Sequence, residues 1–301
     1  MTRRLNPLEP FLRVFFEKLN FLNAFISNCE ISVKRFRSSL AEAQRRRAEH
    51  GIPLRGGWSL IIADIADLPQ GDAEVSWMNS FPSGKHKLEG DEYFAFVDRI
   101  SQMQAALTVA QAYELHETYL LDLVTTCVAA HTSDAEATKF KKVCPKEGKY
   151  PPSRKADWRE LVVKAYRGKN NKDLLAYLRR LAPAVKQYET INRRQFDLPG
   201  WYRVLSTVRH ATVHQQLVIR GHQLSTLSAT ERGVLERYFS GVPEDESYRI
   251  ALEGDDAKVA LRTLGEYAYL HFKGLSEQYG YPPMIREAAR TANGTEQRET
   301  T

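Results

Sequence analysis

A heptad pattern that determines the fold runs through residues 92–130, EYFAFVDRISQMQAALTVAQAYELHETYLLDLVTTCVAA. Apolar side chains recur in it at steps of three and four residues, which is the spacing of one face of an α-helix. The residues on that face are Ile100, Met103, Leu107, Ala110, Leu121 and Val124. The sequence therefore predicts one long helix here, with an apolar stripe that faces a core.

Two carboxylates, Glu114 and Glu117, fall on the same stripe. A carboxylate on an apolar face is costly unless it is paired. In one interpretation, one of the glutamates faces Arg209 or a histidine. In the other, the stripe drifts toward Val109 and Tyr113, which leaves both glutamates at its solvated edge.

A second long helix is predicted over residues 8–49, because apolar residues again recur at helical spacing. Its predicted buried residues are Leu12, Phe15, Phe16, Leu19, Leu22, Phe25 and Ile26. Glycines and a proline end this helix after residue 50, and residues 58–65 and 73–78 then predict a β-hairpin. Residues 80–90, rich in Gly, Pro, Lys and Ser, are predicted to be a linker.

The rest of the chain predicts shorter elements around a basic loop. In order, they are a loop over 139–155, helices over 158–166 and 174–188, a helix opened by the turn 197–200, strands over 216–220 and 248–252, and a last helix from Asp255 or Asp256. Ser228 opens a capping box, Ser-Ala-Thr-Glu, that predicts a helix between the two strands. The core residues predicted for the last helix are Leu261, Leu264, Ala268 and Leu275. Residues 286–301 carry almost no large apolar side chain and predict a disordered tail.

The composition is that of a soluble globular protein with 301 residues, 43% of them hydrophobic and 27% charged. No apolar run approaches the ~18 residues that span a membrane, and residues 1–7 lack the apolar core of a secretory signal. The three cysteines are widely spaced without a Cys-x-x-Cys pair, which favours a reducing cytoplasm. We predict an extension over 1–90, a helical domain over 91–285 and the tail.

The net charge of +6 conceals a basic block over residues 139–194. That block contains 17 Lys and Arg against 5 Asp and Glu, a local charge of +12, so the remainder of the chain carries −6. A basic block on an otherwise acidic protein favours a polyanion such as RNA, although a solvated, salt-bridged region has the same composition. The lysines predicted to contact RNA are Lys139, Lys141, Lys142, Lys146 and Lys149.

The candidate catalytic residues are Arg209, His210 and His214, in the stretch Arg-His-Ala-Thr-Val-His at residues 209–214. An arginine can hold a phosphate with two hydrogen bonds, and a histidine titrates close enough to neutrality to move protons. Arg209 and His214 are five residues apart, which places them roughly 140° apart around a helix axis. Zinc binding by His210 and His214, or burial of both in a core, are the competing interpretations.

This stretch resembles the Arg-polar-x3-His motif of HEPN-domain ribonucleases, with His210 as the polar residue. The resemblance implies a mostly α, HEPN-like helical bundle, to which this chain adds short β-hairpins and the N-terminal extension of helix and hairpin. It further implies a homodimer that builds one cleft from two copies of the motif. Glu114 and Glu117 are possible supporting residues.

The function implied is metal-independent endoribonuclease activity without a cofactor, in which the 2′-hydroxyl of RNA attacks the adjacent phosphorus and leaves a 2′,3′-cyclic phosphate. His214 would act as general base or acid, Arg209 would stabilise the phosphoryl charge, and His210 would orient the phosphate. In that family such enzymes are toxins or antiviral-defence effectors, with an antitoxin or defence protein as partner. The alternatives are a non-catalytic RNA-binding or regulatory module and a metal-dependent hydrolase.

Overall fold

The computed structural model describes residues 5–63, 78–131, 134–143, 150–152, 154–166, 172–193 and 197–282. Most of these residues are helical, which confirms the predicted mostly α class. The helices are α1 (Glu9–Glu49), α2 (Asp91–His131), α3 (Asp134–Val143), α4 (Lys155–Tyr166), α5 (Lys172–Leu181), α6 (Pro183–Thr190), α7 (Leu198–His214), α8 (Gly221–Leu224), α9 (Ala229–Tyr238) and α10 (Gly254–Gln278). The strands are β1 (Arg55–Ala63), β2 (Met78–Glu89), β3 (Val218–Ile219), β4 (Gly241–Glu244) and β5 (Ser247–Ile250).

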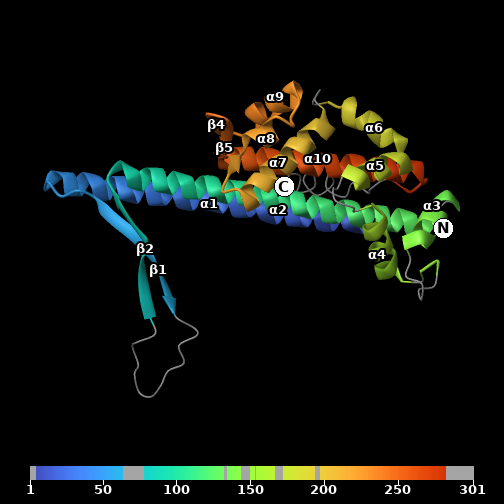
Figure 1. Ribbon diagram of the computed structural model, residues 1–301, viewed down its shortest axis with the longest axis horizontal. Coiled ribbons are helices and arrows are strands. Elements are labelled where there is room, and N and C mark those ends of the chain that lie inside the picture. Colours follow the sequence, from blue (N-terminus) through green and yellow to red (C-terminus); the bar gives the residue numbers. More distant parts are fainter. Residues whose placement is uncertain are drawn as a thin grey trace, which may run out of the picture.

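The two long helices α1 and α2 lie side by side along the whole molecule (Figure 1). Over one half of their length, α10 packs on both long helices and α7 packs on α2 (Figure 1). α9 packs on α7, α6 on α10, and α4 on α2. The other half forms an arm that carries the β1–β2 hairpin (Figure 1). The first half of α1 accordingly contributes to the main core through Leu12, Phe15, Leu19, Leu22 and Ile26.

The α1 prediction is confirmed for the helix and for most of its buried face. Phe25 is the exception, since 45% of it is exposed, and Phe16 is only partly buried. Beyond Cys29 the helix leaves the main core, and a second small cluster joins Leu40 to Leu54 and Val97. The predicted boundary after residue 90 stays a prediction, although the start of α1 and most of α2 share one core.

The apolar stripe predicted on α2 is wrong in its first half. Ile100, Met103 and Leu107 are 39%, 47% and 51% exposed. The face that meets the core contains Ala105, Ala106, Val109, Ala112 and Tyr113 instead. An α-helix turns every 3.6 residues, so a seven-residue repeat drifts by ~20° in each heptad. From Leu121 back to Ile100 the drift is about 60°. Because α7 and α10 also pack only on the second half of α2 (Figure 1), Ile100 is exposed whereas Leu121 is buried.

The predicted hairpin is confirmed, but its second strand and the linker are misplaced. β1 pairs antiparallel with β2, from Arg55 opposite Glu89 to Ala63 opposite Met78. The predicted linker over 80–90 therefore lies almost entirely in β2, and most of the strand predicted over 73–78 falls outside the described residues.

Two predictions around the basic block need correction. The loop predicted over 139–155 begins inside α3, because Phe140 is fully buried with its ring edge-on to Trp158 and Tyr166. The single helix predicted over 174–188 is divided into α5 and α6 at Pro183, whose missing N–H and fixed φ suit the first turn of a new helix.

The C-terminal predictions are confirmed. β3 and β5 pair antiparallel within a three-stranded sheet, whose third strand, β4, the sequence analysis did not predict. Ser228 and Glu231 form the capping box of α9. α10 begins at Gly254, within two residues of the predicted start, and its four predicted core residues are buried. Residues 286–301 lie outside the described part of the chain. Within that part, no helix combines the length and apolar character needed to cross a membrane.

Candidate active site

Helix α7 carries the motif, and the turn before it fixes where the helix begins. The Asp197 carboxylate accepts a hydrogen bond of 3.0 Å from the Gly200 N–H, which caps the helix, and Pro199 lies in its first turn. The buried face contains Trp201, Tyr202, Val204, Leu205, Val208 and Ala211. This packing holds the last turns of α7, which bear Arg209, His210 and His214, at the surface of the bundle.

Arg209 points from α7 to α2, where it meets Glu114. Its Nε donates to Glu114 Oε1 at 2.6 Å, and its Nη2 forms an ion pair with the same oxygen. The two side chains are 29% and 39% exposed. The interpretation that one stripe glutamate faces Arg209 therefore agrees with the structure. A guanidinium held in this way keeps other N–H donors for an anion.

His210 and His214 lie one helical turn apart, and their ring centroids are 5.0 Å from each other. Both residues are exposed, which excludes their burial in the core. Partial burial, together with the neighbouring His214 and Arg209, lowers the pKa of His210 below its usual value. His210 therefore favours the neutral form at neutral pH, which can accept a proton.

Although Arg209 and His214 are both on α7, their side chains are not joined by a contact within one copy of the chain. Arg209 is tied to α2, and within the described residues no hydrogen bond links it to either histidine. The arrangement agrees with the angular separation expected for residues five positions apart. One copy of the chain thus presents an arginine–glutamate pair and a histidine pair on neighbouring parts of α7.

Glu117 has a different environment from Glu114. It is 7% exposed and lies close to Tyr113, whose hydroxyl donates to Ser206 Oγ at 3.2 Å and whose ring stacks on Tyr202. Burial and the Glu117 carboxylate raise the pKa of Tyr113 above its usual value. The predicted drift of the stripe toward Val109 and Tyr113 is correct, but Glu117 is not at a solvated edge.

Two of the predicted RNA-binding lysines, Lys141 and Lys142, are described with their side chains, and both lie far from the motif. Lys141 and Lys142 are exposed on α3, and Lys141 Nζ is 5.5 Å from the centroid of the Tyr150 ring. The side chain of Lys139 and all of Lys146 and Lys149 lie outside what the structure describes. α3 follows the end of α2, and 17 residues of that helix, about 26 Å, separate Glu114 from its last residue.

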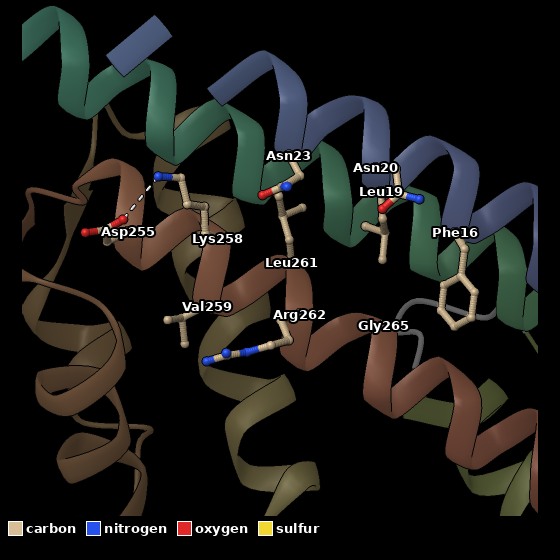
Figure 2. A pocket seen from close by; sticks show the side chains of 10 residues that line it. All are labelled: Phe16, Leu19, Asn20, Asn23, Asp255, Lys258, Val259, Leu261, Arg262 and Gly265. Atoms are coloured by element: carbon tan, nitrogen blue, oxygen red, sulfur yellow. Dashed lines mark hydrogen bonds and ion pairs between the residues drawn. The ribbon is translucent and has the colours of Figure 1, made fainter. Parts of the chain in front are cut away.

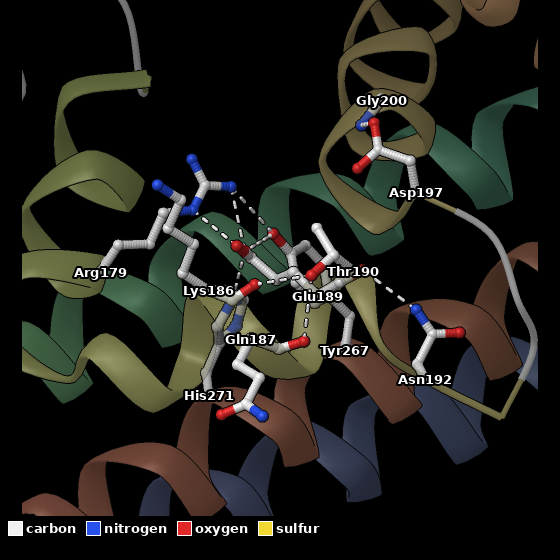
Figure 3. A network of polar contacts seen from close by, with 10 residues as sticks. All are labelled: Arg179, Lys186, Gln187, Glu189, Thr190, Asn192, Asp197, Gly200, Tyr267 and His271. Carbon is white, nitrogen blue, oxygen red and sulfur yellow. Dashed lines mark hydrogen bonds and ion pairs between the residues drawn. The ribbon is translucent and has the colours of Figure 1, made fainter.

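A buried polar network in the core was missed by the sequence analysis (Figure 3). Arg179 donates to both Glu189 oxygens, at 2.7 and 3.0 Å, and the Tyr267 hydroxyl donates to Glu189 Oε1. His271 Nε2 lies 3.8 Å from the same oxygen, which is an ion-pair distance and not a hydrogen bond. Burial raises the pKa of Glu189, but His271, Arg179 and Tyr267 outweigh it and bring the pKa to about 2.

The network continues through a second buried histidine. His116 is fully buried, its Nδ1 is 3.2 Å from the Tyr202 hydroxyl, and its ring centroid is 5.6 Å from that of His271. Burial lowers the pKa of both histidines, and their mutual repulsion lowers that of His116 further. The only sequence signal was a histidine between two tyrosines on the core side of α2, a pattern that does not reveal its partners.

No family model, no curated protein and no solved structure matches this chain. The likeness to HEPN ribonucleases therefore rests on the six residues 209–214. Among the described residues, no three His, Cys, Asp or Glu side chains gather as the ligands of a metal ion would.

Proposed function

We propose that this chain is a metal-independent endoribonuclease of the HEPN type. The observation that carries the proposal is the pair of touching, exposed imidazoles that immediately follows an oriented arginine on α7. Two imidazoles and a guanidinium are the groups that phosphodiester cleavage needs when no metal takes part.

The proposed roles follow from the protonation of the two imidazoles. One neutral imidazole removes the proton of the 2′-hydroxyl, whose oxygen then forms a bond to phosphorus. The bond from phosphorus to the 5′-oxygen breaks, and a protonated imidazole supplies that oxygen with its proton. The products are a 2′,3′-cyclic phosphate and a 5′-hydroxyl. The lowered pKa of His210 suits it to the first step in addition to orienting the phosphate, and His214 would then serve as the acid.

Arg209 would stabilise the charge that grows on the phosphoryl oxygens. Glu114 is bound to Nε and Nη2 of the Arg209 guanidinium. The other N–H donors of Arg209 therefore remain for phosphate. Glu114 is in this scheme a positioning residue, because it orients Arg209 and does not itself touch the RNA.

A homodimer would join the separated parts of the site. α2 and α7 run antiparallel, since Glu114 meets Arg209 whereas His116 meets Tyr202. Val213, 49% exposed, therefore lies toward the same end of α2 as the exposed residues Ile100, Met103 and Leu107. Exposed apolar side chains at heptad spacing are typical of a helix–helix interface. A two-fold axis on this surface would bring two copies of the motif together.

The cellular role belongs to the same proposal. Because the motif resembles that of toxins and antiviral-defence effectors, we propose such a role, a cytoplasmic location and an antitoxin or defence protein as partner. A second candidate, a non-catalytic RNA-binding or regulatory module, is favoured by the Glu114–Arg209 ion pair, which neutralises the arginine when RNA is absent.

Cleavage of purified total RNA, with and without EDTA, tests the proposal. We expect products with 2′,3′-cyclic phosphate ends in excess EDTA, and a His214→Ala protein that folds but does not cleave. His222→Ala, at another exposed histidine on α8, is the matched control and should retain activity. Binding without cleavage by the unaltered chain would favour the second candidate, and 3′-hydroxyl ends would exclude the proposed chemistry.

A further inference from the structure

A cleft of about 620 Å³ lies between α1 and α10, away from the α2–α7 contact that holds the motif (Figure 2). The two helices run antiparallel and meet at both ends of it. At one end, Lys258 pairs with Glu30, and a side chain at Gly254 would collide with that carboxylate. At the other end, a side chain on Gly265 would touch Leu19 and Phe16.

The cleft has an apolar floor. Leu19 and Leu261 are 6% and 4% exposed and belong to the main core, while Phe16 and Val259 are partly buried at the walls. Figure 2 shows the Phe16 ring extending from α1 toward α10 beside Gly265. A flat ligand thus finds apolar surface beneath it and an aromatic ring at one end.

Polar groups stand at the rim on both helices. Asn20 and Asn23 are exposed on α1, and within the described residues their side-chain amides have no hydrogen-bond partner. Across the cleft, Arg262 is exposed on α10 and has no ion pair among those residues. Free carboxamides recognise edges that carry both donors and acceptors, and a free guanidinium recognises a phosphate or carboxylate.

Lys258 adds a second cation one helical turn before Arg262. It is paired with Glu30 and, at 3.1 Å, with Asp255, whose side chain is 88% exposed. An ion pair with so exposed a carboxylate contributes little, so a phosphate can replace Asp255 at low cost. In Figure 2 the Lys258 ammonium is turned toward Asp255 and the Arg262 guanidinium lies beside Val259, so the two would hold one anion only after Lys258 turns away from Asp255.

We propose that this cleft binds a nucleoside monophosphate. The base would lie on Leu19 and Leu261, and the amides of Asn20 and Asn23 would hydrogen-bond to its edge. The phosphate would bind Arg262 and Lys258. The volume falls within the range of about 300–1,000 Å³ that small-molecule sites occupy. The site does not depend on RNA cleavage, since it shares no residue with the motif on α7.

Calorimetric titration of the full chain with AMP, adenosine and inorganic phosphate tests the proposal. We expect AMP to bind at millimolar concentration or tighter, and each of the other two to bind at least about tenfold more weakly. Arg262→Gln should weaken AMP binding about tenfold, and Asn23→Ala should weaken binding of both AMP and adenosine. Both positions are exposed, so the variants should keep the fold, which circular dichroism checks.

Two matched controls separate this cleft from other sites. Arg232→Gln, at an exposed arginine of α9, and Arg209→Ala, in the motif, should both leave AMP binding unchanged. Loss of binding in Arg209→Ala alone would assign AMP to the motif and overturn the proposal, whether or not the chain cleaves RNA. Phosphate that binds as tightly as AMP would overturn the nucleotide class, and the absence of AMP binding at millimolar concentration would overturn the site.

Discussion

At the scale of single residues, Arg209 of the motif pairs with Glu114 of α2. The Glu114 carboxylate lies beside the buried face of α2, and Arg209 of α7 supplies its cation across the helix pair. The sequence predicted that Glu114 or Glu117 would need a partner, but not which one. Which glutamate meets Arg209 depends on how α2 is rotated about its own axis. In the structure, that rotation places Glu114 at the surface and Glu117 beneath it.

Glu114→Gln tests the positioning role of this carboxylate. The amide keeps the size of the side chain but removes its charge, so Arg209 becomes a freer cation with a less defined orientation. We expect RNA binding to hold or tighten while the rate of cleavage falls about tenfold, equivalent to about 1.4 kcal/mol in the barrier. Single-turnover kinetics separates the two effects. Glu17→Gln, at an exposed glutamate on α1, is the control, and equal rates in both variants would contradict the role.

The buried histidines predict how stability depends on pH. Burial holds the pKa of His116 and His271 below the usual ~6.5, so the unfolded chain binds protons that the folded chain does not. Their contribution is present above that pH and is lost as the pH falls below it. The pKa of Glu189 is lowered to about 2 from 4.5, so its contribution is lost only below 4.5, as pH falls toward 2.

We therefore expect the free energy of unfolding to fall by on the order of 1 kcal/mol between about pH 7.5 and about pH 5.5, as urea titrations would measure. His116→Phe preserves a ring in the core and should reduce this pH dependence. His222→Phe, at an exposed position, should leave it unchanged. The same pH dependence in the His116→Phe protein and in the unaltered chain would show that His116 does not titrate on unfolding.

At the scale of elements, the sequence predicts the long helices well and their orientation poorly. The extents of α1 and α2 follow from apolar spacing that persists over many turns. Which face of α2 is buried depends on what lies beside it at each point along its length. α7 and α10 pack on its second half (Figure 1). Ile100, Met103 and Leu107 lie in its first half and are exposed. A single sequence does not reveal where the helices that pack on α2 begin and end.

The exposed stripe on α2 gives a test of the proposed dimer. Met103→Glu and Leu107→Glu together place two charges on the surface that would join the copies. We expect light scattering to show a dimer for the unaltered chain and a monomer for this variant, with RNA cleavage lost and thermal stability retained. Val242→Glu, at a 54% exposed position of β4, should remain a dimer. A variant that cleaves RNA at the normal rate as a monomer would exclude a site composed of two chains.

At the scale of the whole molecule, α7, which bears the motif, lies between the arm at one end and α3 at the other (Figure 1). The sequence places the basic residues and the motif within one stretch of chain, yet the fold separates them. Lys141 and Lys142 lie beyond the end of α2, and Glu114 lies about 26 Å before that end. Proximity in sequence was therefore a poor guide to whether these groups act on the same nucleotide.

This separation predicts that the lysines act on long RNA only. Lys141→Gln with Lys142→Gln should weaken the binding of a long single-stranded RNA and reduce the slope of log K against log salt by about 1.5, because two phosphate contacts are lost. Cleavage of a dinucleotide should be unchanged, since it cannot bridge about 26 Å.

Lys34→Gln with Arg35→Gln removes a matched pair of exposed cations from α1 and should change neither measurement. Equal salt slopes for the two double variants would mean that α3 does not contact RNA. Slower dinucleotide cleavage in the Lys141 and Lys142 variant would mean instead that α3 approaches the motif in the active assembly, as it would if a second copy supplied it.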